Sequence, residues 1–165
     1  MDSSIYLDLI VHSAELQSDT GEERWRAAKT VFDAIDRQQI RLAGSSLIHA
    51  EVCCNGHARV RAKRSGNVAK RLVEWFESPD HAWTEIDDFI AQDAVRLSAE
   101  HHTKSERGKR FNSADVLHLA CAIRLGCDYL MTQDGGFPVG HKIDGVQVIR
   151  PRVVWQETLE EASAE

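Results

Sequence analysis

One stretch of the sequence, residues 112–134 (NSADVLHLACAIRLGCDYLMTQD), limits the possible fold more than any other. Positions 116–125 are apolar apart from His118 and Arg124, and a helix that is apolar nearly all round is a buried one. Asn112 or Ser113 suits the N-cap of this helix, and Gly126 suits its end. Because a short buried strand is expected to follow at 129–132, the stretch predicts a helix feeding a parallel α/β sheet.

The rest of the chain continues this alternation of helices and strands. Strands are expected at 5–11, 40–44, 81–86 and 146–149, the last of them at a sheet edge, with helices over 25–35, after Ser45 and Ser46, from Val68, and after Asp87 or Asp88. At 165 residues the chain fits one domain, which we place at 1–155, followed by an acidic tail at 156–165. The sequence therefore predicts a single α/β domain.

Four acidic residues follow the expected strands or open the helices after them. Asp8 is the single acid in the apolar run at 4–11, which we interpret as a strand with a carboxylate at its carboxyl end. Glu51 lies one turn into the helix after the second strand, Asp115 lies in the first turn of the buried helix, and Asp134 ends the following strand. In an α/β sheet such positions converge on one edge. Carboxylates brought together repel one another unless a cation lies among them, and oxygen ligands suit Mg²⁺ or Mn²⁺. The pattern indicates a metal site able to promote phosphodiester cleavage.

Each of these residues also has a simpler interpretation. Asp8 could be a helix cap or turn residue, and Glu51 a solvated helix residue. His118 follows Asp115 by three positions, so it could contact the site or a phosphate, or be a packed, hydrogen-bonded histidine.

Charge distribution and composition limit the partners and the compartment. The net charge is −6, yet 55–71 is rich in Arg and Lys and has no acid, and a second basic run spans 104–110. We expect Arg59, Arg61, Lys63 and Arg64 to bind nucleic acid, the alternative being a solvated basic loop and helix start. No apolar run is long enough for a membrane span, and there is no signal peptide, so a cytoplasmic protein with reduced cysteines is expected.

The sequence also resembles a known family. IYLD at 5–8, IRLAGSSLIHAEV at 40–52, ADVLHLACAIRLGCDYLMTQD at 114–134 and Phe137 are similar to motifs of the PIN-domain ribonucleases, among them the VapC-type toxins of toxin–antitoxin pairs. The resemblance implies a three-layer α/β/α sandwich with a mainly parallel sheet of four or five strands. It also implies an acidic metal site at Asp8, Glu51, Asp115 and Asp134.

The same resemblance implies an Mg²⁺- or Mn²⁺-dependent endoribonuclease that acts on RNA, forms a homodimer and is restrained by a small antitoxin protein. Two positions depart from the family pattern. Ile10 stands where a polar residue commonly follows the first acid, and Gly136 stands where many members carry a second Asp.

Three functional classes remain open at this stage. The first is the metal-dependent endoribonuclease, and the second is a PIN-like domain that binds RNA or protein but cleaves weakly or not at all because of Ile10. The third is an unrelated α/β phosphotransfer domain, either a receiver or a haloacid-type phosphatase. The second acid that such a phosphatase needs is absent at Ile10, and the chain lacks a convincing receiver pattern.

Overall fold

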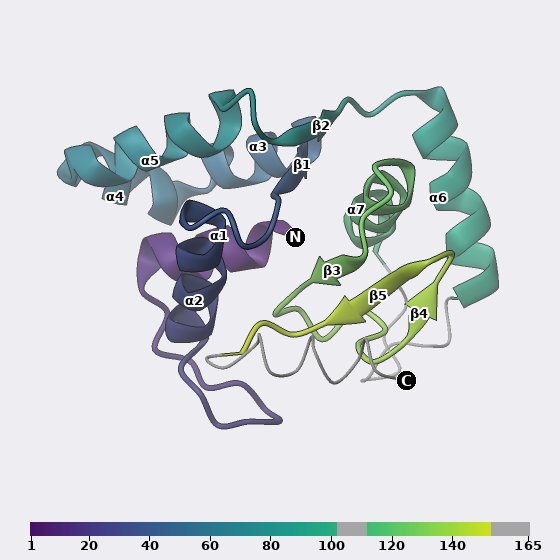
Figure 1. Cartoon of the computed structure of the whole chain (residues 1–165), viewed down its shortest axis with the longest axis horizontal. Helices are drawn as coiled ribbons and strands as arrows, with labels where there is room; N and C mark the ends of the chain where they lie inside the picture. The colour runs from purple at the N-terminus through teal and green to yellow at the C-terminus, as the bar shows by residue number, and fades with distance from the viewer. Residues whose placement is uncertain (102–111, 153–165) are drawn as a thin grey trace.

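The structure, a computed structural model, describes residues 1–101 and 112–152 (Figure 1). The basic run at 104–110 and the tail at 156–165 lie outside these residues. The described elements, in chain order, are α1 (Ser3–Val11), α2 (Arg24–Asp36), β1 (Ala43–Ser45), α3 (Ser46–Cys54), α4 (Gly56–Arg64), α5 (Gly66–Glu77), β2 (Ala82–Thr84), α6 (Asp88–His101), α7 (Ser113–Arg124), β3 (Tyr129–Met131), β4 (Lys142–Ile143) and β5 (Val146–Ile149).

The strand predicted at 5–11 is wrong, because these residues lie in helix α1. Ile5, Tyr6, Leu9 and Ile10 are all buried, and this spacing places them on one side of a helix. Asp2 is the N-cap, and its side chain accepts a hydrogen bond from the backbone N–H of Ser4. A nearly continuous apolar run is compatible with a strand or a buried helix, and here packing favours the helix.

The helix and strand predicted within 112–134 are confirmed as α7 and β3. Asn112 is the N-cap of α7, and it forms a capping box with Asp115 in which each side chain accepts from the other residue's backbone N–H. After α7 the chain turns at Gly126, whose φ of +62° favours glycine. Asp115 is therefore fixed at the start of a buried helix.

The strands form two separate sheets in place of the expected single sheet of four or five strands. β1 pairs in parallel with β2, while the second sheet has the order β3-β5-β4, with β3 parallel and β4 antiparallel to β5. β5 is thus central and not at an edge as expected, and β4 was not predicted. Since residues 3–11 are helical, no described strand joins β1 to β3, and the start of the chain lies between the two sheets (Figure 1).

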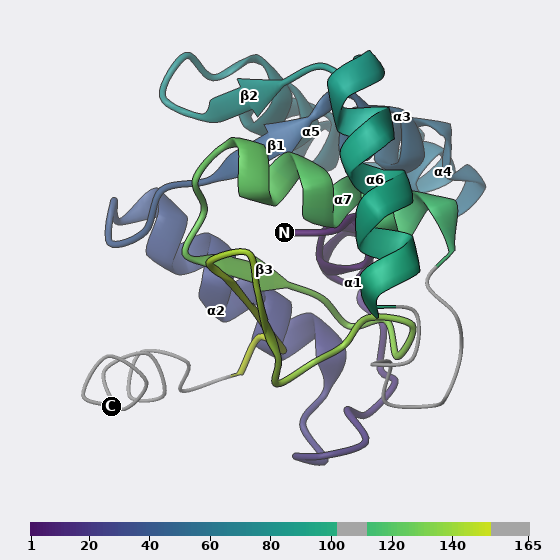
Figure 2. The ribbon, with the colours of Figure 1, turned by 90° about the vertical axis from the view of Figure 1, so that its right-hand side faces the viewer.

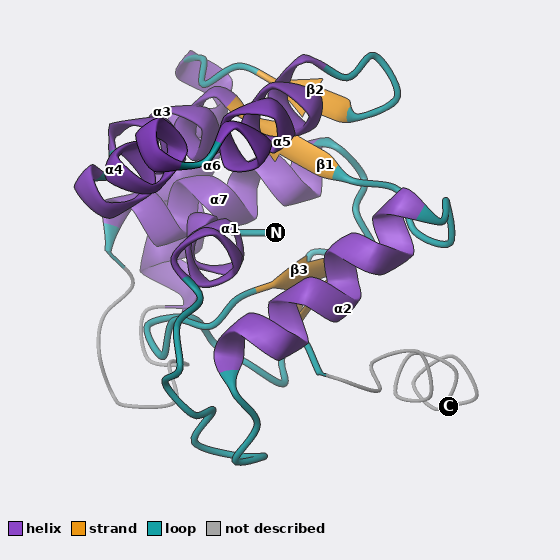
Figure 3. Cartoon of the chain, turned by 90° about the vertical axis from the view of Figure 1, so that its left-hand side faces the viewer, coloured by secondary structure: helices purple, strands orange, loops and turns teal. Residues whose placement is uncertain are grey.

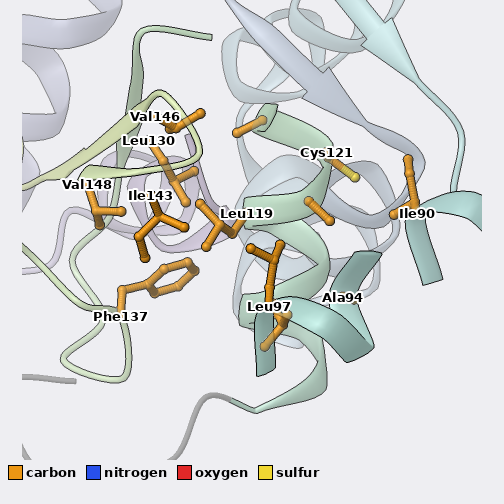
Figure 4. Close-up of a cluster of buried hydrophobic side chains, with 13 residues drawn as sticks. Ile90, Ala94, Leu97, Leu119, Cys121, Leu130, Phe137, Ile143, Val146 and Val148 are labelled. Carbon is orange, nitrogen blue, oxygen red and sulfur yellow. The ribbon is translucent and has the colours of Figure 1, made fainter. Parts of the chain in front are cut away.

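The three-stranded sheet has helices on both faces. Leu130 and Val148 point into a core shared with α6 and α7, which lie side by side (Figures 2 and 4). Met131 and Ile149 point to the other face, where Val31 of α2 packs, and α2 covers β3 in Figure 3. Alternate residues of a strand face opposite sides. This part of the molecule has the predicted α/β/α layering.

Helices α3, α4 and α5 gather at one end of the molecule, beside α1 (Figure 1). Tyr6 of α1 lies at the centre of their aromatic core, where its ring contacts those of Phe32, Trp75 and Phe76.

The basic run at 55–71 is not a loop, because it forms α4 and the start of α5. Among the described residues, no helix is long and apolar enough to cross a membrane.

Candidate metal centre

Asp8 does not lie at the end of a strand, where the sequence interpretation had placed it. It lies within α1, and its Oδ2 accepts a hydrogen bond of 2.8 Å from Nε of Arg24. Burial raises the pKa of Asp8 to about 6, although the Arg24 guanidinium lowers it. The Nη1 of Arg24 also contacts Oε2 of Glu15 at 2.8 Å. The structure thus gives Asp8 an ion pair with Arg24.

Asp2, and not Asp8, lies beside the end of β3, close to the other acids of the predicted site. The backbone N–H of Asp2 donates to the carbonyl oxygen of Met131 at 3.0 Å. Its Oδ1 accepts from the hydroxyl of Ser4 at 2.6 Å and its Oδ2 from the hydroxyl of Thr132 at 2.8 Å. Asp2 is buried, and desolvation raises its pKa despite these hydrogen bonds.

Asp115 and Asp134 come together across Gly136. Asp134 accepts a 2.9 Å hydrogen bond from the backbone N–H of Gly136. A Cβ added at Gly136 would lie 2.9 Å from Oδ2 of Asp115 and 3.5 Å from Oδ1 of Asp134. Glycine therefore keeps the space between the two carboxylates open, which gives a physical reason for the departure from the family pattern at this position.

The carboxylates of Asp2, Asp115 and Asp134 influence one another. The pKa of Asp115 is raised to about 6, mainly by burial and also by the neighbouring carboxylates of Asp134 and Asp2. The hydrogen bond from the backbone N–H of Asn112, at 3.3 Å, acts in the opposite direction. The structure therefore places Asp115 and Asp134 near each other, with Asp2 beside them.

Glu51 reaches the same region from α3 through a buried histidine. Its Oε2 lies 2.8 Å from Nε2 of His118, and Nδ1 of His118 has no hydrogen-bond partner among the described residues. Burial alone would raise the pKa of Glu51, but hydrogen bonds from His118 and Ser3 lower it. His118 is thus the packed, hydrogen-bonded histidine that the sequence allowed, and it links Glu51 to the helix that carries Asp115.

Asp2, Glu51, Asp115 and Asp134 all offer carboxylate oxygens, which are the ligands that Mg²⁺ or Mn²⁺ prefers. Raised pKa values at Asp2 and Asp115 indicate a site where a cation would relieve repulsion and desolvation. Within 1–101 and 112–152, however, no three acidic, histidine or cysteine side chains are already arranged closely enough to hold a metal ion. Binding would have to draw the carboxylates together.

The four cations expected to bind nucleic acid all lie on α4. Arg59, Arg61, Lys63 and Arg64 are exposed, while Ala58 on the opposite side of this helix is buried. Within the described part of the chain, none of the four forms an ion pair. α4 therefore presents free positive charge to solvent.

Three residues of this region were missed by the sequence interpretation: Asp2, Ser4 and Thr132. Two signals for them were present. Ser4 follows Asp2 by two positions, which is the spacing of the polar residue sought after the first acid, and Thr132 precedes Asp134 by two positions. With Asp2 as the first acid, Ser4 takes the place of the polar residue, and the departure at Ile10 no longer arises. Ile10 is instead a core residue of α1.

The α/β layers place acidic side chains beside the end of β3. Carboxylates gathered at such an edge are typical of proteins that bind a divalent metal ion and act on phosphodiesters. Residues 2–140 match the PIN domain family, so the chain belongs to this family. The match begins at Asp2. No curated protein and no solved structure matches the chain. Membership of the PIN family indicates a nuclease-like activity, nucleic-acid binding and the use of divalent metal ions.

Proposed function

We propose that this chain is a metal-dependent endoribonuclease that hydrolyses RNA phosphodiester bonds. The observation that supports this most is the mutual approach of Asp2, Asp115 and Asp134, with Glu51 joined to the same region through His118. These three aspartates would hold Mg²⁺ or Mn²⁺, and Glu51 would ligate it or orient the attacking water. Asp2 replaces Asp8 in the set of ligands first expected.

The chain's own residues would prepare the site for this chemistry. Ser4 and Thr132 hold the two oxygens of Asp2, the capping box holds Asp115, and the backbone N–H of Gly136 holds Asp134. Such contacts fix ligand orientation, and their loss commonly lowers metal affinity or activity about 10–100-fold. When bound, the ion would stabilise negative charge on the phosphate.

Cleavage of labelled single-stranded RNA and DNA of matched sequence tests the proposal. We expect cleavage of RNA with Mn²⁺ or Mg²⁺, none with EDTA, and at least a hundredfold loss in Asp115→Asn, the scale on which removing one group that stabilises transition-state charge acts. The matched control is Asp80→Asn, since Asp80 is exposed and lies in the turn between α5 and β2, outside the residues of the proposed site. Preferential DNA cleavage would contradict the assignment to RNA, and activity in EDTA the need for metal.

We also propose that the protein acts as the toxin of a toxin–antitoxin pair, as a homodimer bound by a small antitoxin protein. A basic side chain of that partner could neutralise the carboxylates at the metal centre. Co-expression with the product of any small reading frame adjacent to the gene, followed by mass measurement by light scattering, tests this. A monomer at all concentrations that takes up no such protein would contradict the toxin role and leave the nuclease proposal intact.

A further inference from the structure

A polar pocket adjoins the metal centre on the side of Asp134. Its volume is about 350 Å³, and its lining includes Ser4, Glu15, Arg24, Gln133, Asp134 and Arg150. Two residues connect the pocket to the metal centre. Asp134 lines the pocket, and so does Ser4, whose hydroxyl donates a hydrogen bond to Asp2. A volume of this size lies within the range of pockets that bind small organic groups, and a nucleotide is of this size.

Two guanidinium groups in this pocket are held in fixed positions. Arg24 uses Nε to contact Asp8 and Nη1 to contact Glu15, both at 2.8 Å, and no hydrogen bond of Nη2 to a described residue is seen. The Nη1 of Arg150 donates to the backbone carbonyl of Gln133 at 3.2 Å. A pre-positioned guanidinium offers planar donors that match phosphate oxygens. Asp8 thus acts as a positioning residue for Arg24.

Gln133 supplies an independent sign of a ligand. Gln133 is 5% exposed, and neither its Oε1 nor its Nε2 has a hydrogen-bond partner among the described residues. Leaving a buried amide unpaired costs on the order of 1–3 kcal/mol for each group, so a partner beyond the described residues is expected. Gln133 immediately precedes Asp134, and its backbone N–H donates to Ser4 at 3.0 Å. An amide offers both a donor and an acceptor, which suits the edge of a base.

We propose that this pocket holds the nucleotide next to the scissile phosphate of a single-stranded RNA. Arg24 and Arg150 face its phosphate, and the amide of Gln133 pairs with its base. Glu15 and Asp134 in the lining, Asp8 beside Arg24 and Asp19 beside Arg150 offset the two guanidinium charges, so the pocket favours one singly charged phosphodiester over a run of phosphates. The inference rests on the proposed nuclease function, because only a chain crossing the metal centre would place a nucleotide here.

Binding measured without cleavage separates this inference from the nuclease proposal. The probe is a 5′-labelled single-stranded RNA of about eight nucleotides. It is bound in EDTA to the Asp115→Asn protein, which has one carboxylate fewer to repel the RNA phosphates. Arg24→Gln alone would leave Asp8 buried without its partner, so it is made together with Asp8→Asn. The second variant is Gln133→Leu. Arg26→Gln is the matched control, because Arg26 is exposed and pairs with Glu23 outside the pocket.

Each pocket variant should weaken RNA binding about tenfold, the scale of one lost charge-assisted hydrogen bond, while the control binds as before. In the otherwise unchanged protein, Gln133→Leu should also alter which nucleotide flanks the cut, read by sequencing RNA ends. Unchanged binding in both pocket variants would overturn the inference and leave the nuclease intact, as would no measurable binding before either change. Weakened binding in a protein that cleaves no RNA would support the pocket and contradict the nuclease.

Discussion

Asp2 and Asp8 are both buried, but only Asp8 has a guanidinium beside it. The Asp8 carboxylate is neutralised by Arg24, whereas Asp2 has hydroxyl and backbone donors and the neighbouring carboxylate of Asp115. Asp2 has no ion pair among the described residues, and desolvation raises its pKa although the nearby charges of His118 and the amino terminus lower it, so a bound cation would relieve the cost of burying this carboxylate. Asp8 pairs with Arg24, although burial and the neighbouring carboxylate of Asp2 still raise its pKa to about 6.

At the residue scale, the raised pKa of Asp115 predicts a pH-dependent stability in the absence of metal. The folded protein keeps this proton up to a pH of about 6, while the unfolded chain loses it near 3.8. Stability is therefore lost as the pH rises through this window. Asp115→Asn should reduce that loss by roughly 1–2 kcal/mol, allowing for solvent near the carboxylate.

Urea unfolding in EDTA at several pH values from 4 to 7 measures this difference. Asp80→Asn is the control and should follow the parent at every pH, because Asp80 is exposed. If Asp115→Asn also follows the parent at every pH, burial does not raise the pKa of Asp115 as described here.

At the element scale, α1 shows what the sequence pattern alone could determine. α7, β3, β1 and β2 were predictable because caps, glycine and short apolar runs indicate them locally. The pattern at 5–11 did not distinguish a strand from a buried helix, and the helix is chosen by contacts of α1 with α2, α3 and α4. The spacing of Asp2 and Ser4 was a local signal for Asp2. The contact that places Asp2 beside β3, however, depends on Thr132, which is distant in the sequence.

The position of Ile10 in α1 predicts the effect of a polar substitution there. Ile10 is 3% exposed within the core that α1 shares with α2 and α5. Ile10→Asn would bury an unpaired amide and should lower the free energy of unfolding by about 2–4 kcal/mol. Urea unfolding measures this, with Val11→Asn, at an exposed position of the same helix, as the control. A gain in cleavage at unchanged stability would instead favour the interpretation in which Ile10 lies beside the metal.

Helix α4 carries the second prediction at this scale. If about three of its exposed cations contact RNA phosphates, log K for binding should fall with log salt at a slope near −2. Replacing Arg59, Arg61 and Lys63 by Ala should flatten that slope and weaken binding across sequences. The control replaces three exposed cations on other elements, Arg41, Lys142 and Arg152. Equal slopes for the α4 variant and the parent would mean that this helix faces solvent or a protein partner.

At the scale of the whole molecule, three segments distant in the sequence contribute to the proposed metal centre. The start of α1 provides Asp2, α3 provides Glu51, and the α7–β3 stretch provides Asp115 and Asp134. Sequence spacing predicted a role for the last three acids, because each follows a strand or lies early in a helix in a recognisable pattern. It could not show that Glu51 reaches the site through His118, since that contact depends on how α3 packs on α7.

The most direct test of the central claim is the melting temperature as a function of Mn²⁺ concentration. A ligand that binds only the folded state stabilises it by mass action, by about 2.7 kcal/mol at a hundred times its Kd. The parent and Asp8→Asn should both show a rise in melting temperature with millimolar Mn²⁺, whereas Asp2→Asn and Asp115→Asn should lose most of it. No rise in the parent, or a rise that Asp8→Asn abolishes and Asp2→Asn retains, would contradict the site described here.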